Sequence, residues 1–109
     1  MKKLLIAAAM MAGASLAHAG IDVAAATKLA AANACMGCHA VDKKLVGPSY
    51  QDVAAKYKGD KDAVAKLVKK VKGGGSGVWG PIPMPAHPTM SDADAKLLVD
   101  WVLAGAPAK

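Results

Sequence analysis

Two cysteines and a histidine stand together in the stretch CMGCHA, at residues 35–40. Cys35 and Cys38 are the only cysteines of the chain, and His39 follows Cys38 directly. Thiols and an imidazole at this spacing can form a redox dithiol, a disulfide, part of a zinc site or the attachment point of a haem. Each possibility requires a different kind of chain around the motif, so the remaining residues discriminate among them.

Three of these possibilities find little support in the rest of the sequence. A thioredoxin-like dithiol belongs near a βαβ unit, and the chain shows no alternating strand pattern of useful length. A structural zinc site requires four ligands, whereas His87 is the only further histidine after residue 19. A disulfide across so short a loop would restrict the unfolded chain comparatively little.

The motif C-x-x-C-H is the attachment site of c-type haem. Cysteines at positions i and i+3 lie on one face of a helical turn, so both sulfurs can form thioethers with the vinyl groups along one edge of a porphyrin. His39 can then present an imidazole nitrogen to the iron. We therefore expect one covalently bound haem c, attached through Cys35 and Cys38.

Residues 1–19 have the pattern of an export signal. Two lysines precede an apolar run at residues 4–17, and Ala-His-Ala at 17–19 matches an A-x-A cleavage pattern. The alternative, an uncleaved membrane anchor, is disfavoured because the run is much shorter than the ~20 residues that span a bilayer. We therefore expect a cleaved signal peptide at residues 1–19, a single domain at residues 20–109, and a periplasmic protein without stable membrane insertion.

The expected domain has little material for a large apolar core. The chain contains two tryptophans, two tyrosines and no phenylalanine, and many of its nominally hydrophobic residues are alanines. A domain this small usually needs a disulfide, a metal or a large apolar cofactor to be stable. A buried porphyrin would contribute ~25 cal/mol per Å² of apolar surface removed from water, so the composition also favours a haem.

The positive charge of the chain comes from lysine alone. The formal net charge is +6 at pH 7, and all 14 of the Lys and Arg residues are lysines. The absence of arginine argues against nucleic-acid recognition, because arginine is the commonest reader of base edges. A lysine-bearing surface instead suits electrostatically steered docking onto an acidic protein, or serves only to keep the protein soluble.

Four segments show helical periodicity, which predicts an all-α fold. The expected helices run from Asp22 into the CMGCH motif, from Ser49 to Gly59, from near Asp60 to residues 73–75, and from Ser91 to Gly105. The apolar stripe of the last helix contains Trp101. We expect Trp101 to pack in the core near Leu29, against the first helix, where Ala26 and Ala30 permit a close approach.

The segment GGGSGVWGPIPMPAHPTM, residues 73–90, separates the last two helices and is rich in proline. Prolines at this density exclude both helix and sheet, which leaves a disordered linker or a functional loop. Trp79, Ile82 and Met84 suit a solvated linker poorly, and alternating prolines can hold one side chain in place. We expect a functional loop that presents Met84, a soft neutral ligand that raises the potential of a haem iron. A core-filling methionine, or ligation by His87, is the alternative.

These motifs resemble those of the class I cytochromes c, in particular the short exported electron carriers of denitrifying bacteria. The resemblance rests on CMGCH at 35–39, KLVGPSY at 44–50, GVWGPIPMP at 77–85 and a final helix with Trp101, and it covers essentially all of residues 20–109. It implies a class I cytochrome c fold, with about four helices wrapped around one covalently bound haem c. It also implies a carrier that moves one electron by alternating between Fe(II) and Fe(III), and not an enzyme.

The resemblance further implies roles for individual residues. His39 and Met84 would be the two axial ligands of the haem iron. Pro48 would offer its carbonyl oxygen to the other ring nitrogen of His39. Trp79 would direct its indole N–H to a haem propionate, and Lys70 would place a positive charge near the propionates.

One position departs from the pattern of this family. Some relatives carry an asparagine three residues after the methionine, hydrogen-bonded to its sulfur, whereas this chain has His87. The sequence leaves open whether His87 bonds to Met84 in the same way. It also leaves open whether His87 replaces Met84 on the iron.

The resemblance implies redox proteins as partners of an expected monomer. A quinol-oxidising complex or a blue-copper protein would donate the electron, and a nitrite reductase or a terminal oxidase would accept it. The competing interpretation is an enzyme or gas-binding haem protein in which Met84 is off the iron. A third interpretation is a structural or metal-binding module without haem.

Loss of both cysteines tests whether the domain needs a cofactor to fold. In a Cys35→Ala, Cys38→Ala double variant, haem can no longer be attached to the chain. We expect this polypeptide to be largely unfolded, because its own apolar side chains bury too little surface. Far-UV circular dichroism during a thermal scan measures this; native-like helix content and a cooperative transition would contradict the expectation.

Overall fold

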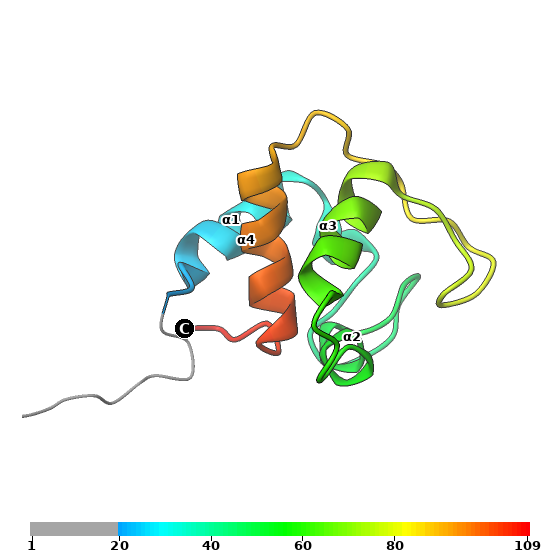
Figure 1. The fold of residues 1–109 in the computed structure, drawn as a ribbon, viewed down its shortest axis with the longest axis horizontal. Coiled ribbons are helices and arrows are strands. Elements are labelled where there is room, and N and C mark those ends of the chain that lie inside the picture. The colour runs from blue at the N-terminus through cyan, green and yellow to red at the C-terminus, as the bar shows by residue number, and fades with distance from the viewer. Residues whose placement is uncertain (1–19) are drawn as a thin grey trace, which may run out of the picture.

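The computed structural model describes residues 20–109, in which four α-helices and one short 3-10 helix are joined by loops (Figure 1). The elements are, in order, α1 (Val23–Ala32), η2 (Cys35–Gly37), α2 (Tyr50–Lys56), α3 (Ala63–Gly73) and α4 (Asp92–Leu103). No strand forms within residues 20–109, although two isolated bridges pair His39 with Lys44 and Gly75 with Met84. The predicted all-α fold with four helices is therefore confirmed.

Two predictions about export and membranes concern different parts of the chain. The export signal predicted at residues 1–19 lies outside the described residues. Among the helices of residues 20–109, none is both long enough and apolar enough to cross a bilayer.

Side-chain caps begin three of the helices at the positions that the sequence predicted. Asp22, Ser49 and Ser91 each accept a hydrogen bond from the backbone N–H three residues further on, at 2.9, 3.0 and 3.0 Å. These bonds satisfy N–H groups that have no partner within the first turn of a helix. The starts of α1, α2 and α4 are therefore fixed by local chemistry.

The connection between α2 and α3 is longer than predicted. α2 ends at Lys56 instead of Gly59, and α3 begins at Ala63 instead of near Asp60. The Asp60 carboxylate accepts a hydrogen bond from the N–H two residues further on, at 2.8 Å, and pairs with Lys66, also at 2.8 Å. These bonds stabilise a turn before the helix, so Asp60 is not its cap.

A left-handed residue separates α1 from the CMGCH motif. The sequence predicted one helix running into the motif, but α1 ends at Ala32 and Cys35 begins the separate turn η2. Ala34, between them, has φ 58°, a conformation that costs a residue with a Cβ about 1–2 kcal/mol. The Asn33 side chain donates to the Leu29 carbonyl at 2.9 Å and so helps to end α1. The two cysteines therefore lie on a turn of their own.

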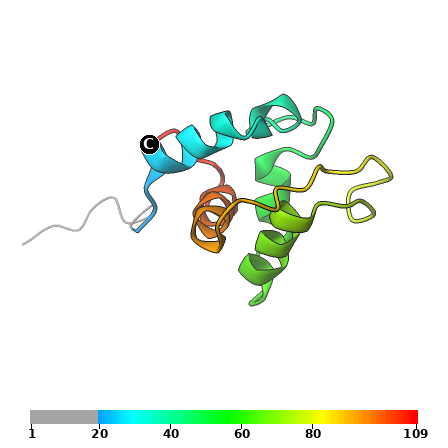
Figure 2. The ribbon, with the colours of Figure 1, turned by 90° about the horizontal axis from the view of Figure 1, so that it is seen from above.

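Helix α4 is central, because α1, α2 and α3 each pack against it (Figures 1 and 2). In the core cluster shared by α1 and α4, Ala26, Ala30 and Ala95 are almost completely buried. Trp101 belongs to the same cluster, is 3% exposed, and donates from Nε1 to the Pro107 carbonyl at 2.9 Å. The prediction that Trp101 is a core residue packed near the alanine-rich face of α1 is confirmed.

The proline-rich segment forms an irregular loop at residues 74–91, between α3 and α4 (Figures 1 and 2). Within it, the N–H of Gly77 donates to the Gly80 carbonyl at 2.8 Å, which closes a turn at the tip. Near the end of the loop, the His87 N–H donates to the carbonyls of Val71 and Lys72, both at 3.1 Å. Backbone hydrogen bonds therefore tie the loop to the end of α3.

Candidate functional site

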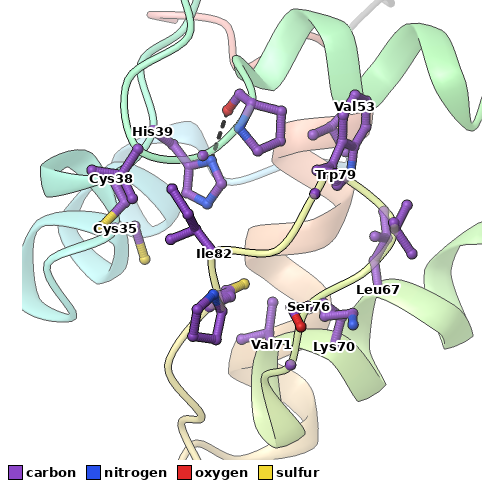
Figure 3. A pocket seen from close by; sticks show the side chains of 18 of the residues that line it. Cys35, Cys38, His39, Val53, Leu67, Lys70, Val71, Ser76, Trp79 and Ile82 are labelled. Carbon is purple, nitrogen blue, oxygen red and sulfur yellow. Dashed lines mark hydrogen bonds between the residues drawn. The ribbon is translucent and has the colours of Figure 1, made fainter.

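The residues predicted to carry the chemistry line one cavity of about 230 Å³. Its walls come from η2 and the segment after it, from α2, α3 and α4, and from the loop at residues 74–91. Figure 3 shows Cys35, Cys38 and His39 on one side of this cavity and Leu67 and Lys70 of α3 on the other. Every predicted site residue is in the lining: Cys35, Cys38, His39, Pro48, Lys70, Trp79 and Met84.

The His39 ring is held by contacts on several sides. Its Nδ1 lies 2.7 Å from the Pro48 carbonyl oxygen (Figure 3). A carbonyl only accepts, so Nδ1 carries the proton and Nε2 keeps a lone pair for a metal. Tyr50 stacks on the ring with centroids 5.2 Å apart, and a Cβ on Gly47 would lie 2.6 Å from His39 Cε1. The ring therefore has a defined tautomer and little room to turn.

The Cys35 thiol lacks the lowered pKa of a redox-active dithiol. Cys35 and Cys38 are both free and half-buried. Burial raises the pKa of the Cys35 thiol; a backbone hydrogen bond opposes this rise, and the nearby Cys38 adds to it to a smaller extent. Reactive dithiols instead lower the pKa of the attacking cysteine. Within residues 20–109, no three potential ligands among His, Cys and Asp come together around a metal position.

Met84 is fixed through its backbone by the glycines that follow α3. Its N–H donates to the Gly75 carbonyl at 2.9 Å, and its carbonyl accepts from the Gly75 N–H at 3.0 Å. Gly74 has φ 69°, and a Cβ there would lie 2.5 Å from the Met84 carbonyl oxygen. The glycine run, which in the sequence indicated the end of a helix, is therefore also needed for the backbone to approach Met84 closely.

Lys70 and Trp79 contribute polar groups to an otherwise mainly apolar lining. Lys70 is half-buried, and none of the ion pairs within residues 20–109 includes it. An ammonium group without a carboxylate partner at an apolar cavity fits a ligand that carries negative groups. Trp79 is exposed at the mouth, where Lys56 Nζ lies 5.5 Å from its ring centroid, a cation–π distance. No pattern in the sequence indicates this contact of Lys56 with Trp79.

His87 lies outside the cavity lining. Its Nδ1 and Nε2 are 3.3 Å from the carbonyl oxygens of Val71 and Asn33, respectively. No hydrogen bond joins it to Met84 within the described residues. Both alternatives that the sequence left open for His87, a bond to the Met84 sulfur and ligation in place of Met84, are disfavoured by this arrangement.

The lining residues fit a covalently attached haem. Two half-buried thiols lie on one turn, an imidazole offers Nε2, and a thioether comes from the rigid loop. Nitrogen and thioether ligands suit haem iron, and the apolar walls suit a porphyrin. An unpaired lysine at the wall would complement carboxylates on the rim of such a group.

Comparison with known proteins gives a consistent result. The sequence profile of the cytochrome c family matches residues 23–106. Cytochrome c-552 of Nitrosomonas europaea is 56% identical over 75 residues, or 69% of this chain and 73% of that protein. Cytochrome c-552 of Hydrogenobacter thermophilus is 48% identical over 104 residues, or 94% and 97%. The crystal structure of wild-type Nitrosomonas europaea cytochrome c552 is similar with a TM-score of 0.69 and 53% identity, covering 72% of this chain and 98% of that one.

Two glycine substitutions near the cysteines test how tightly the His39 ring is held. Gly47→Ala should lower the free energy of unfolding by about 1–3 kcal/mol, because the new methyl group overlaps the ring. Gly37→Ala, inside the CMGCH motif, is the matched control, since its Cβ would meet nothing within 4 Å. Thermal unfolding of both purified variants measures the difference. Equal stabilities would show that the ring can move aside.

Proposed function

The chain belongs to the cytochrome c family, and from this premise we propose that it carries single electrons between redox proteins of the periplasm. Its fold is that of a class I cytochrome c, and its cofactor is one covalently bound haem c. It is an electron-transfer protein and not an enzyme. One observation supports the roles proposed for Cys35, Cys38, His39 and Met84: all four line the same cavity.

In the proposed site, four residues hold the cofactor. Cys35 and Cys38 would attach it through thioethers, and His39 Nε2 and the Met84 sulfur would be the ligands of its iron. When bound, the haem supplies an iron that gains or loses one electron. His39 and Met84 together would leave no position on the iron open to a substrate.

The chain's own contribution is to keep both ligands in place in either oxidation state. The Pro48 carbonyl fixes the tautomer of His39, so Nε2 would be free of a proton and available to the iron. The two hydrogen bonds with Gly75 hold the backbone of Met84. Ligands that are held in the same place before and after electron transfer need little rearrangement. In addition, the neutral thioether of Met84 would favour the reduced state of the iron.

Lys70 and Trp79 would orient the propionate side of the cofactor. The Lys70 ammonium lacks a carboxylate partner among the described residues, and a propionate would provide one. We propose that the Trp79 indole N–H donates to a propionate, with Lys56 packed over the ring. A point charge and one directional donor would together hold the carboxylates at the cavity wall.

The proposed docking surface is the mouth patch, defined as Leu45, Val46, Val78, Trp79 and Ile82. These large apolar side chains are 43–60% exposed, and all but Leu45 line the cavity. Lys43 and Lys44 are exposed next to the patch in sequence. An apolar centre with lysines at its edge suits brief docking of an acidic partner. We propose a quinol-oxidising complex or blue-copper protein as donor and a nitrite reductase or terminal oxidase as acceptor.

The periplasmic location rests on the sequence of residues 1–19. Two lysines, an apolar run and Ala-His-Ala at 17–19 match a cleaved export signal. Cleavage after residue 19 would release the domain at residues 20–109. Export would also bring the thiols of Cys35 and Cys38 into the periplasm.

Replacement of Met84 tests its proposed role as an iron ligand. We expect oxidised Met84→Ala protein to lose the methionine-to-iron charge-transfer absorption band, because no sulfur remains on the iron. Met36→Leu is the control, since Met36 is 42% exposed in the attachment turn and its loss should leave the band intact. Persistence of the band in Met84→Ala would refute the assignment.

Salt dependence tests whether the lysines next to the mouth patch steer a partner. The rate constant for electron transfer to an acidic periplasmic blue-copper protein should fall as ionic strength rises, because salt screens exposed charges. A Lys43→Gln, Lys44→Gln variant should be roughly two- to tenfold slower at low salt and less sensitive to salt. Lys28→Gln, on α1, should match the parent. Stopped-flow measurement with a flat salt profile for the parent would exclude steering.

A further inference from the structure

The His87 side chain connects parts of the fold that no other side-chain hydrogen bond connects within the described residues. Its Nε2 is 3.3 Å from the carbonyl oxygen of Asn33, 54 residues earlier in the chain. Asn33 caps the end of α1, where carbonyls have no partner in the helix. Asn33 also lies two residues before Cys35, whose Sγ is 4.0 Å from the same oxygen. The His87 side chain therefore links the loop at residues 74–91 to the segment that carries the cysteines.

The second contact of the ring repeats a connection that the backbone already makes. His87 Nδ1 is 3.3 Å from the Val71 carbonyl, but the His87 N–H already donates to this carbonyl and to that of Lys72, both at 3.1 Å. The loop would remain attached to α3 without the side chain. The contact with Asn33 is the one that depends on the imidazole.

We infer that His87 is a positioning residue for Met84, which it holds by tying the end of the loop to Asn33 at the end of α1. This inference rests on the proposed role of Met84 as an iron ligand. The two proposed ligands come from different segments, since His39 follows η2 and Met84 lies in the loop. The His87–Asn33 contact holds these two segments together on the side of the cysteines, so its loss lets the loop move away from them.

Two conservative substitutions separate the contacts of the ring. A carbonyl oxygen only accepts, and a neutral imidazole carries one N–H, so the ring donates to only one of the two carbonyls; in this proposal the proton is on Nε2 and the bond goes to Asn33. The amide nitrogen of glutamine falls near the place of Nε2, whereas that of asparagine falls near the place of Nδ1. His87→Gln therefore preserves the donor to Asn33, and His87→Asn instead places a donor near Val71. Only the first should keep Met84 in position.

Carbon monoxide binding to the reduced, haem-loaded protein measures how often Met84 leaves the iron. We expect His87→Ala and His87→Asn to bind carbon monoxide about tenfold faster than the parent, the effect of losing roughly one hydrogen bond. His87→Gln should stay within about twofold. In the oxidised proteins, the methionine-to-iron band should disappear at a lower temperature in the first two variants, ahead of the loss of helix seen by circular dichroism.

Asp92→Asn is the matched control for general loosening. Asp92 pairs with Lys72 across α3 and α4, and within residues 20–109 no side-chain hydrogen bond or ion pair joins Asp92 to the loop around Met84. Its loss should leave the rate of carbon monoxide binding unchanged. The inference would be overturned if Asp92→Asn bound carbon monoxide as fast as His87→Ala does. It would also be overturned if His87→Gln and His87→Asn bound carbon monoxide at equal rates. A parent protein that lacks the methionine band would instead refute the role of Met84, which separates the two failures.

Discussion

The interior of this protein is organised around a cavity as well as around its own side chains. Of the eleven buried hydrophobic residues that the structure describes, five are alanines, and the larger ones include Trp101, Tyr50 and Leu98. Other apolar groups, such as Leu67 and Val71, line the cavity and stay only half-buried. A porphyrin is the kind of group that completes such an interior. A bound haem would therefore contribute to the core as well as to electron transfer, and every described helix except α1 contributes to the wall of that cavity.

Glycine has a particular role at both proposed iron ligands. Gly47 lets the backbone pass against the His39 ring, and Gly74 lets it pass against the Met84 carbonyl. Loops are usually the mobile parts of a fold, yet both ligands lie outside the helices. Close backbone packing and hydrogen bonds with the backbone of Pro48 and Gly75 supply the rigidity that helices would otherwise provide. A one-electron carrier benefits because its ligands need not move when the charge changes.

Local chemistry explains which features could be predicted from the sequence. Helix starts at Asp22, Ser49 and Ser91 were predictable because a cap bonds to the N–H three residues away. The CMGCH motif likewise identified Cys35, Cys38 and His39, because these three site residues are close together in the sequence. The left-handed conformation of Ala34 was not predictable, since alanine carries no signal for it. The partners of the His87 ring lie 16 and 54 residues away, so only the folded chain brings them together.

The central position of α4 has a consequence for how the protein matures. Among the described α-helices, α1, α2 and α3 each pack against α4 and not against one another, although α4 comes last in the chain. If the chain is exported N-terminus first, no two of these α-helices can pack together until this final segment arrives, and only the contact of η2 with α1 can form earlier. The cavity walls that α2, α3 and α4 share with the turn of Cys35 and Cys38 therefore come together last. The cysteines are thus more accessible to a modifying reaction before α4 arrives than in the finished fold, where both thiols are half-buried.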